Sequence, residues 1–232
     1  MKHHEFEPPF KHHTELNPKI WDAPDQRMKG EVRGALLRIA QDFIEFVGVP
    51  IQVQDVVVTG GMANYNYSRH SDIDLHVIAD MSQVDCDRAV DELFDTKRLL
   101  YKKNYDLSIH RIPVELYIEN VDMPAVSQGE YSVTHDRWLR KPTDMEPDWN
   151  EESVQHWVQV WRTVLLKAVE SRDLHSLRTS VQLLKAYRRL GLQTTNAEFS
   201  TPNLVYKSLR NDQTLAQVLT LIDRLHVQQL SI

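Results

Sequence analysis

Two aspartates, Asp72 and Asp74, stand at the start of a segment that otherwise has the pattern of an apolar β-strand. Residues two apart in an extended chain point to the same face, so their carboxylates come close together. Two like charges at that spacing disfavour each other unless a cation lies between them. Such hard oxygen ligands suit Mg²⁺, which usually takes one or two carboxylates together with substrate phosphates. The pair therefore predicts a magnesium site that acts on a phosphate-bearing substrate.

A second metal ion in such a site would need a further acidic ligand. Glu115, in the segment IPVELYI, can supply it if the strand predicted over 112–118 lies beside the one predicted over 72–78. Glu119 shares a strand face with Glu115, and Asp106 lies on the neighbouring predicted strand, so both stay open as alternatives. Two ions held in this way would activate an attacking hydroxyl and stabilise a leaving pyrophosphate.

A double glycine precedes the aspartates and follows a predicted strand directly. Gly60 and Gly61 would let the backbone approach a bound anion closely. If residues 62–67 form a helical turn, its free N–H groups would point at the phosphates. Hydroxyl donors and a positive charge for phosphate binding are available from the following loop residues: Ser68, Arg69 and Ser71.

The run from Gly60 to Leu75 resembles the signature of the DNA polymerase β-like nucleotidyltransferase superfamily. That signature joins a double glycine or Gly-Ser, a spacer of about this length and an Asp-x-Asp or Asp-x-Glu pair on the next strand, with a third carboxylate on a later strand. The resemblance covers about residues 28–120. The superfamily more often has Ser at the position of Gly61 and Asp at the position of Glu115.

The resemblance implies a small mixed β-sheet flanked by helices, of the α/β (α+β) class. It further implies transfer of a nucleoside monophosphate from a nucleoside triphosphate, with ATP as the expected donor, to an acceptor hydroxyl. Two Mg²⁺ ions, or Mn²⁺ in their place, would be required. The expected catalytic and metal-binding residues are Asp72, Asp74 and Glu115. The expected nucleotide-binding residues are Gly60, Gly61, Ser68, Arg69 and Ser71.

The sequence leaves the acceptor open. A small molecule such as an aminoglycoside-like antibiotic fits an acidic cleft, an RNA 3′ end fits the basic C-terminal helices, and a protein side chain fits a toxin-type transferase. The segment GEYSVTHDRW, residues 129–138, is a further candidate for acceptor recognition.

Two rival functions are a degenerate module that binds a nucleotide without turnover and a metal-dependent phosphohydrolase. The intact acids disfavour the first, and the scarcity of nearby histidines, only His76 and His110, disfavours the second.

Several other polar groups have ordinary explanations. A histidine on a strand, such as His76, is more often a hydrogen-bonded structural residue than a substrate ligand. Lys102 and Lys103 could steer a triphosphate, but a solvated lysine pair is the simpler interpretation. A basic cluster on the helical part fits either acceptor phosphates or a solvated face: Arg172, Arg178, Lys185, Arg188 and Arg189.

The elements that must position the motif follow from hydrophobic periodicity. Helices are expected from residue 28 to Gly48 and over 85–95, and strands over 51–58, 72–78, 105–110 and 112–118, the last two as an antiparallel pair. Apolar stripes after residue 150 predict a small helical bundle. The expected organisation is an N-terminal arm over 1–27, a nucleotidyltransferase domain over 28–140, a linker over 141–149 and a helical domain over 150–232.

Composition excludes several classes of protein. The chain of 232 residues is 41% hydrophobic and 26% charged, the balance of a soluble globular protein. No apolar run has the length of a membrane span, and MKHHEFEPPFKHH lacks the apolar core of a secretory signal. Cys86 is the only cysteine, which excludes an internal disulfide and favours a reducing, cytoplasmic setting.

The net charge of −6 is distributed unevenly along the chain. Residues 1–136 carry 14 basic and 23 acidic side chains, a net of −9, whereas residues 137–232 carry 13 and 10, a net of +3. This asymmetry indicates two functional halves. The overall negative charge disfavours a large nucleic-acid footprint, which usually shows a strong basic excess.

Overall fold

The chain divides into two compact units in the computed structural model, which describes residues 6, 8–81, 88–122, 127–195 and 197–231. The first, called here the sheet unit, comprises Lys11–Met145. The second, the helical unit, comprises Met1–Phe10 together with Glu146–Ile232. The division between Met145 and Glu146 falls inside the segment 141–149 that was expected to be a linker.

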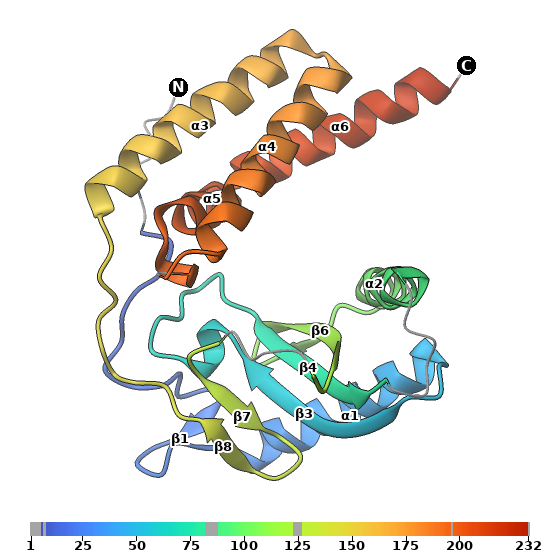
Figure 1. The fold of residues 1–232 in the computed structure, drawn as a ribbon, viewed down its shortest axis with the longest axis vertical. Coiled ribbons are helices and arrows are strands. Elements are labelled where there is room, and N and C mark those ends of the chain that lie inside the picture. The colour runs from blue at the N-terminus through green and yellow to red at the C-terminus, as the bar shows by residue number, and fades with distance from the viewer. Residues whose placement is uncertain (1–5, 7, 82–87, 123–126, 196, 232) are drawn as a thin grey trace. The chain divides into compact units, whose positions relative to one another are not determined.

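The sheet unit is built on a six-stranded mixed sheet, which confirms the predicted α/β (α+β) class (Figure 1). Its strand order is β5-β6-β4-β3-β7-β8. Strands β4 and β6 run parallel, and every other neighbouring pair is antiparallel. The bounds are β3 Gln52–Thr59, β4 Ile73–Asp80, β5 Ser108–Ile109, β6 Ile112–Asn120, β7 Glu130–Ser132 and β8 Arg137–Arg140.

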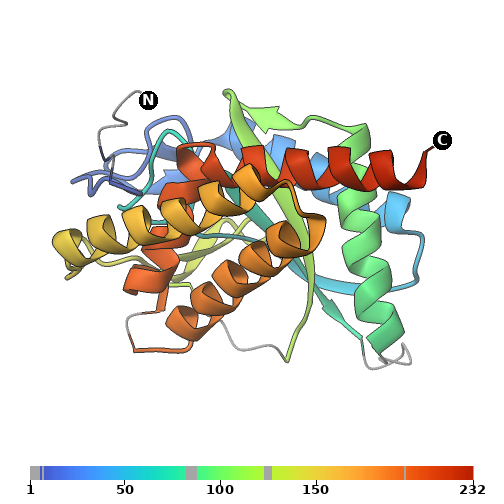
Figure 2. The same ribbon diagram turned by 90° about the horizontal axis from the view of Figure 1, so that it is seen from above.

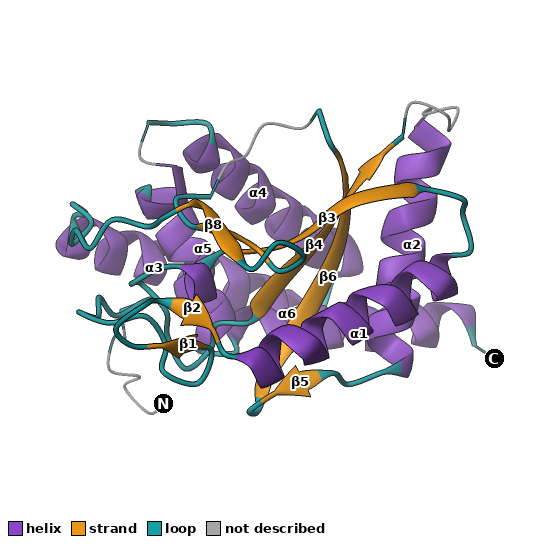
Figure 3. Cartoon of the chain, turned by 90° about the horizontal axis from the view of Figure 1, so that it is seen from below, coloured by secondary structure: helices purple, strands orange, loops and turns teal. Residues whose placement is uncertain are grey.

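Alternation along β4 gives the sheet one apolar and one polar face. Ile73, Leu75 and Val77 are fully buried, whereas Asp74 and His76 between them are only partly buried. The apolar residues share one core with the buried face of helix α1 (Gly30–Val47), which lies across the sheet in Figure 3. A second helix, α2 (Arg88–Asn104), contacts β6. The polar face of β4 therefore carries Asp74, and Asp72 lies just before the strand.

Part of the segment that was expected to form an N-terminal arm, from Lys11 onward, packs into the sheet unit. Residues Trp21–Asp22 (β1) and Arg27–Met28 (β2) form a small antiparallel pair, and Leu16, Ile20 and Trp21 are buried in the core of the sheet unit. The indole N–H of Trp21 donates a 2.7 Å hydrogen bond to the carbonyl of Met62. Apolar residues spaced irregularly among prolines show no period, so this packing could not be predicted.

The stretch GEYSVTHDRW contains β7 and the start of β8, which pair as an antiparallel hairpin. Tyr131 is fully buried and donates a 2.7 Å hydrogen bond to Asp136. Trp138 stacks on Trp21 with ring centroids 4.6 Å apart, and its indole N–H donates to the carbonyl of Gln26. These contacts give the segment a structural role, and its suggested part in acceptor recognition stays a prediction.

The helical unit consists of α3 (Glu151–Ser171), α4 (Leu174–Leu192), α5 (Thr201–Asn211) and α6 (Thr214–Leu230), coloured from yellow to red in Figure 2. Asn150 and Asp173 cap α3 and α4 by accepting hydrogen bonds from backbone N–H groups. Within the described part of the chain, no helix has the length and apolar character needed to cross a membrane.

Candidate functional site

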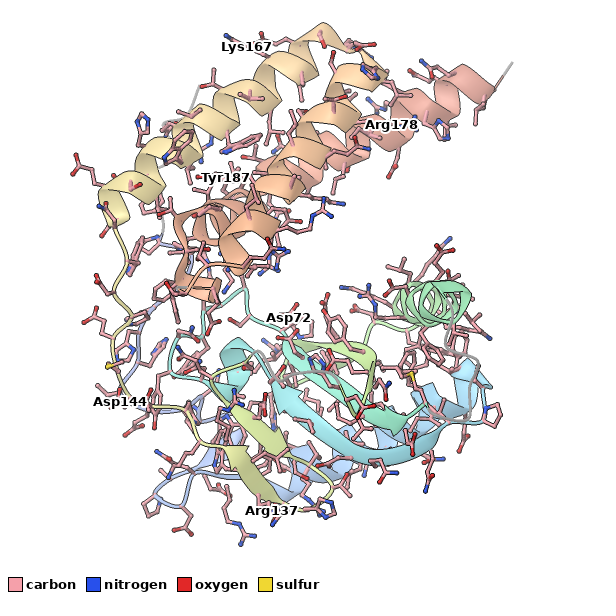
Figure 4. The ribbon with its side chains drawn as sticks, in the orientation of Figure 1. Asp72, Arg137, Asp144, Lys167, Arg178 and Tyr187 are labelled. Carbon is pink, nitrogen blue, oxygen red and sulfur yellow. The ribbon has the colours of Figure 1, made fainter. Side chains whose placement is uncertain are left out.

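Three carboxylates meet at the start of β4, as the sequence predicted. Asp74 on β4 is paired in register with Glu115 on the parallel strand β6, and Asp72 lies just before β4 (Figure 4). One oxygen of each carboxylate lies within 4.8 Å of the other two. Among the residues that the structure describes, this is the only group of three or more such side chains with metal-ligand spacing. Glu119 and Asp106 do not belong to the group, so Glu115 is the third acid.

Gly60 lies directly against the carboxylate of Asp74. Strand β3 ends at Thr59, which is paired in register with Asp74, and the chain then turns at Gly60 with φ +72°. A Cβ atom at residue 60 would lie 1.9 Å from Oδ2 of Asp74, so a larger residue could not fit without moving that carboxylate. The glycine is required here both by backbone conformation and by space.

The second glycine begins a shorter helical turn than the one expected over 62–67. Gly61–Ala63 forms a single turn of 3-10 helix, η1, and a Cβ atom on Gly61 would lie 3.1 Å from Oγ of Ser71. The Ser71 hydroxyl therefore lies beside the glycine turn, as a phosphate-binding hydroxyl would need to.

Ser68 and Arg69 take more peripheral places in the same loop. The backbone N–H of Ser68 donates to Oγ of Ser71 at 2.9 Å, and Ser68 Oγ accepts from the N–H of His70 at 3.1 Å. These bonds fix the loop and position Ser71. Arg69 is exposed and its Nε lies 3.0 Å from Nε2 of His70.

Glu115 is held by two donors that sequence reasoning did not assign to it. The ammonium of Lys102, in the last turn of α2, donates to Oε1 of Glu115, and the hydroxyl of Tyr117 donates to Oε2 at 2.8 Å. Lys102 is thus exposed, as the solvated-pair interpretation expected, but it is also ion-paired with an acid of the site. The contact of Tyr117 with Glu115 could have been predicted, because the two residues are two apart on the same face of one strand. The contact of Lys102 with Glu115 could not, because nothing in the sequence pattern places α2 beside β6.

The protonation behaviour of Glu115 follows from these contacts. Burial alone would raise the pKa of Glu115, but the hydrogen bonds from Lys102 and Tyr117 and the charges of Lys102 and Arg98 lower it below its ordinary value. Burial and the negative charges of Asp74 and Glu115 raise the pKa of Tyr117. Glu115 is therefore ionised and Tyr117 protonated at neutral pH, the states needed for a metal ligand and its hydrogen-bond donor.

A second set of polar contacts lies beside the three acids. Nε2 of His76 is 3.0 Å from the hydroxyl of Thr59, and Nδ1 of His76 is 2.9 Å from Oε1 of Glu119. His76 also stacks on Tyr117, with ring centroids 4.8 Å apart. These contacts give His76 and Glu119 a structural role. Glu119 does not join the acidic group because it lies four residues beyond Glu115 on β6, in register with Ile78.

We expect replacement of Glu119 by Gln to make folding stability less dependent on acid pH. The hydrogen bond from His76 lowers the pKa of Glu119 from its ordinary value of 4.5, so the ionised form favours the folded state. This stabilisation is fully present at pH values above the ordinary carboxyl pKa. It is lost as the pH falls through the lowered pKa of Glu119 in the folded protein. Because Glu119 is partly exposed, the effect should be below about 1 kcal/mol.

Urea unfolding of wild type and E119Q at several pH values checks this expectation. The wild type should be the more stable protein at pH 6, and the difference should shrink as the solution is acidified below the ordinary carboxyl pKa. A difference that grows on acidification would contradict it.

No protein-family model, curated protein or solved structure matches the chain. Function must therefore be inferred from the residues and their geometry. Three converging carboxylates can hold divalent cations, and a glycine turn with an adjacent serine hydroxyl can accept phosphate groups.

Proposed function

We propose that the sheet unit is a divalent-metal-dependent nucleotidyltransferase that moves a nucleoside monophosphate from a nucleoside triphosphate to an acceptor hydroxyl. The observation that carries the proposal is the meeting of Asp72, Asp74 and Glu115 beside a turn where Gly60 has no room for a side chain. The resemblance of the Gly60–Leu75 run to the DNA polymerase β-like superfamily agrees with this reaction.

The donor set of the site fits Mg²⁺ or Mn²⁺. All three groups are carboxylates, the ligands that hard divalent ions prefer, and their oxygens lie close enough to be drawn onto ions with ligand distances of about 2.0–2.1 Å. Asp72 and Asp74 would hold two ions and Glu115 one of them. When bound, the ions would make an acceptor hydroxyl more acidic and stabilise charge on the leaving pyrophosphate.

The rest of the site would bind and orient the triphosphate. The β- and γ-phosphates would approach the backbone at Gly60 and Gly61, and the Ser71 hydroxyl, which lies beside Gly61, would donate to them. Ser68 holds Ser71 in place, and Arg69 offers a charge at the edge of the loop. ATP is the expected donor, the acceptor is a small molecule, an RNA 3′ end or a protein hydroxyl, and the reducing cytoplasm is the expected compartment.

Two observations weigh against the rival functions. A degenerate nucleotide sensor would lack one of the acids, whereas here all three lie together. A metal-dependent phosphohydrolase would want histidine ligands, but His76 is engaged by Thr59 and Glu119, and no histidine of the described residues joins the carboxylate group.

Pyrophosphate release tests the proposed function directly. Each of the four nucleoside triphosphates is incubated with the protein, Mg²⁺ and one acceptor class at a time: RNA, aminoglycosides, or protein including the chain itself. We expect pyrophosphate together with an acceptor that has gained the mass of a nucleoside monophosphate. Release of inorganic phosphate, with an unmodified acceptor, would instead indicate a phosphohydrolase, and binding without turnover a sensor.

We expect Glu115→Gln to lower the rate of transfer by about 10- to 100-fold, the range for lost partners of a metal site. Glu119→Gln is the matched control, since it lies on the same face of β6 but binds His76. Its rate should stay within about twofold of wild type, because the substitution leaves the three acids in place. Pyrophosphate release at saturating Mg²⁺ measures both, and a slow E119Q with a normal E115Q would reassign the third ligand.

A further inference from the structure

Both oxygens of Glu115 already have donors. Lys102 occupies Oε1, and Tyr117 occupies Oε2. A carboxylate oxygen that accepts one hydrogen bond still has a lone pair for a metal ion, but a divalent ion bound by Glu115 would lie close to the ammonium of Lys102, and the two positive charges would repel each other.

Lys102 is the donor that can leave. Its side chain is 57% exposed and reaches Glu115 on a flexible stem from the last turn of α2. Tyr117, in contrast, is a rigid ring held between His76, with centroids 4.8 Å apart, and the guanidinium of Arg98, 5.1 Å from its centroid. A partly exposed ion pair of this kind is weak, so a divalent cation can displace the ammonium.

A second positive charge lies near Lys102. Arg98 lines the same small pocket beside Glu115, together with tyrosines and the apolar side chains of Leu107, Val114 and Leu116, and its charge also acts on the Glu115 carboxylate. A lysine at the edge of a metal site can bind phosphate as a point charge. The ammonium would move from a carboxylate to a phosphate oxygen without leaving the site.

We infer that Lys102 is an exchangeable counter-ion of the site: it neutralises Glu115 before metal binding, is displaced by the divalent cation, and then binds a phosphate oxygen of the nucleotide. This inference rests on the proposed function. It assigns Lys102 opposite effects on the two ligands, because the same charge opposes the metal and favours the nucleotide. Replacing a residue with only a structural role would not change the metal affinity and the nucleotide affinity in opposite directions.

Two binding measurements on the full chain test the exchange. Mn²⁺ alone is titrated into the protein and followed by electron paramagnetic resonance, and a non-hydrolysable ATP analogue is then titrated at saturating Mn²⁺. We expect Lys102→Met to bind Mn²⁺ about three- to fivefold more tightly and the analogue about three- to fivefold more weakly, the size of a partly exposed ion pair. Lys102→Arg should resemble wild type, and Lys103→Met, on the exposed neighbouring residue, should change neither affinity.

The outcomes separate the inference from the proposed function. If wild type binds both Mn²⁺ and the analogue but K102M matches it in either affinity, the exchange is wrong and the proposed function stands. If K102M binds Mn²⁺ more weakly, Lys102 supports the metal site and the exchange is also wrong. If wild type binds neither ligand, both proposals fail.

Discussion

Replacing Asp74 by Asn should lower nucleotidyl transfer by more than about a hundredfold while the protein stays folded. Asp74 is the central acid of the site, with Glu115 in register on one side and Thr59 on the other. In the proposed site its carboxylate is a ligand of both ions, so its loss should exceed the 10- to 100-fold effect of removing a metal-site partner. We expect the same of Asp72→Asn.

The fold should survive because Asp74 has two acidic neighbours within 4.8 Å. Removing one of several like charges relieves repulsion in the metal-free protein, so the melting temperature should not fall. Circular dichroism melts and pyrophosphate release are measured on the same samples. Asp106→Asn, at an exposed acid outside the group, is the control and should keep wild-type activity. Full activity in D74N would remove this carboxylate from the chemistry.

Replacing Gly60 by Ala should damage both stability and activity. The backbone at residue 60 has φ +72° and ψ −157°, a region that is essentially restricted to glycine and costs other residues about 1–3 kcal/mol. The new Cβ would also lie 1.9 Å from Oδ2 of Asp74 and would push that carboxylate out of the acidic group. We therefore expect a lower free energy of unfolding and a loss of transfer comparable to that of D74N.

Gly34→Ala is the matched control for this prediction. Gly34 lies inside α1, and a Cβ there would make only an ordinary 3.5 Å contact with Arg38. Alanine in a helix interior should stabilise the protein by up to about 1 kcal/mol and leave activity unchanged. Urea unfolding and pyrophosphate release, both carried out below the melting temperature of each variant, compare the two. A G60A protein with wild-type stability and activity would show that neither the backbone nor the space at residue 60 is restrictive.

Most of the acidic site could be predicted from the sequence, because it depends on strand alternation, the pairing of neighbouring strands and a glycine turn. The alternation of apolar and polar residues along β4 predicted that Asp74 lies on the polar face of the strand. The parallel pairing of β4 with β6 places Glu115 beside it. The double glycine correctly predicted where β3 ends. A glycine is needed at residue 60 because the Asp74 carboxylate leaves no room there for a side chain.

The parts that were missed depend on tertiary contacts. The strands β1, β2 and β7 have two or three residues each, too few to show a period, and they are held by the packing of Trp21, Tyr131 and Trp138. Helix α2 continues to Asn104, beyond the expected end at residue 95, because Tyr101 packs into the core. That extension is what brings Lys102 to Glu115, so the same error hid the contact.

A crystal structure of the protein with Mn²⁺ and a non-hydrolysable ATP analogue, with the metal located by anomalous scattering, tests the proposed chemistry most directly. We predict manganese peaks bound by Asp72, Asp74 and Glu115, and a triphosphate that lies along Gly60 and Gly61 near Ser71. Manganese bound elsewhere, or a nucleotide that does not contact the glycine turn, would contradict the proposal.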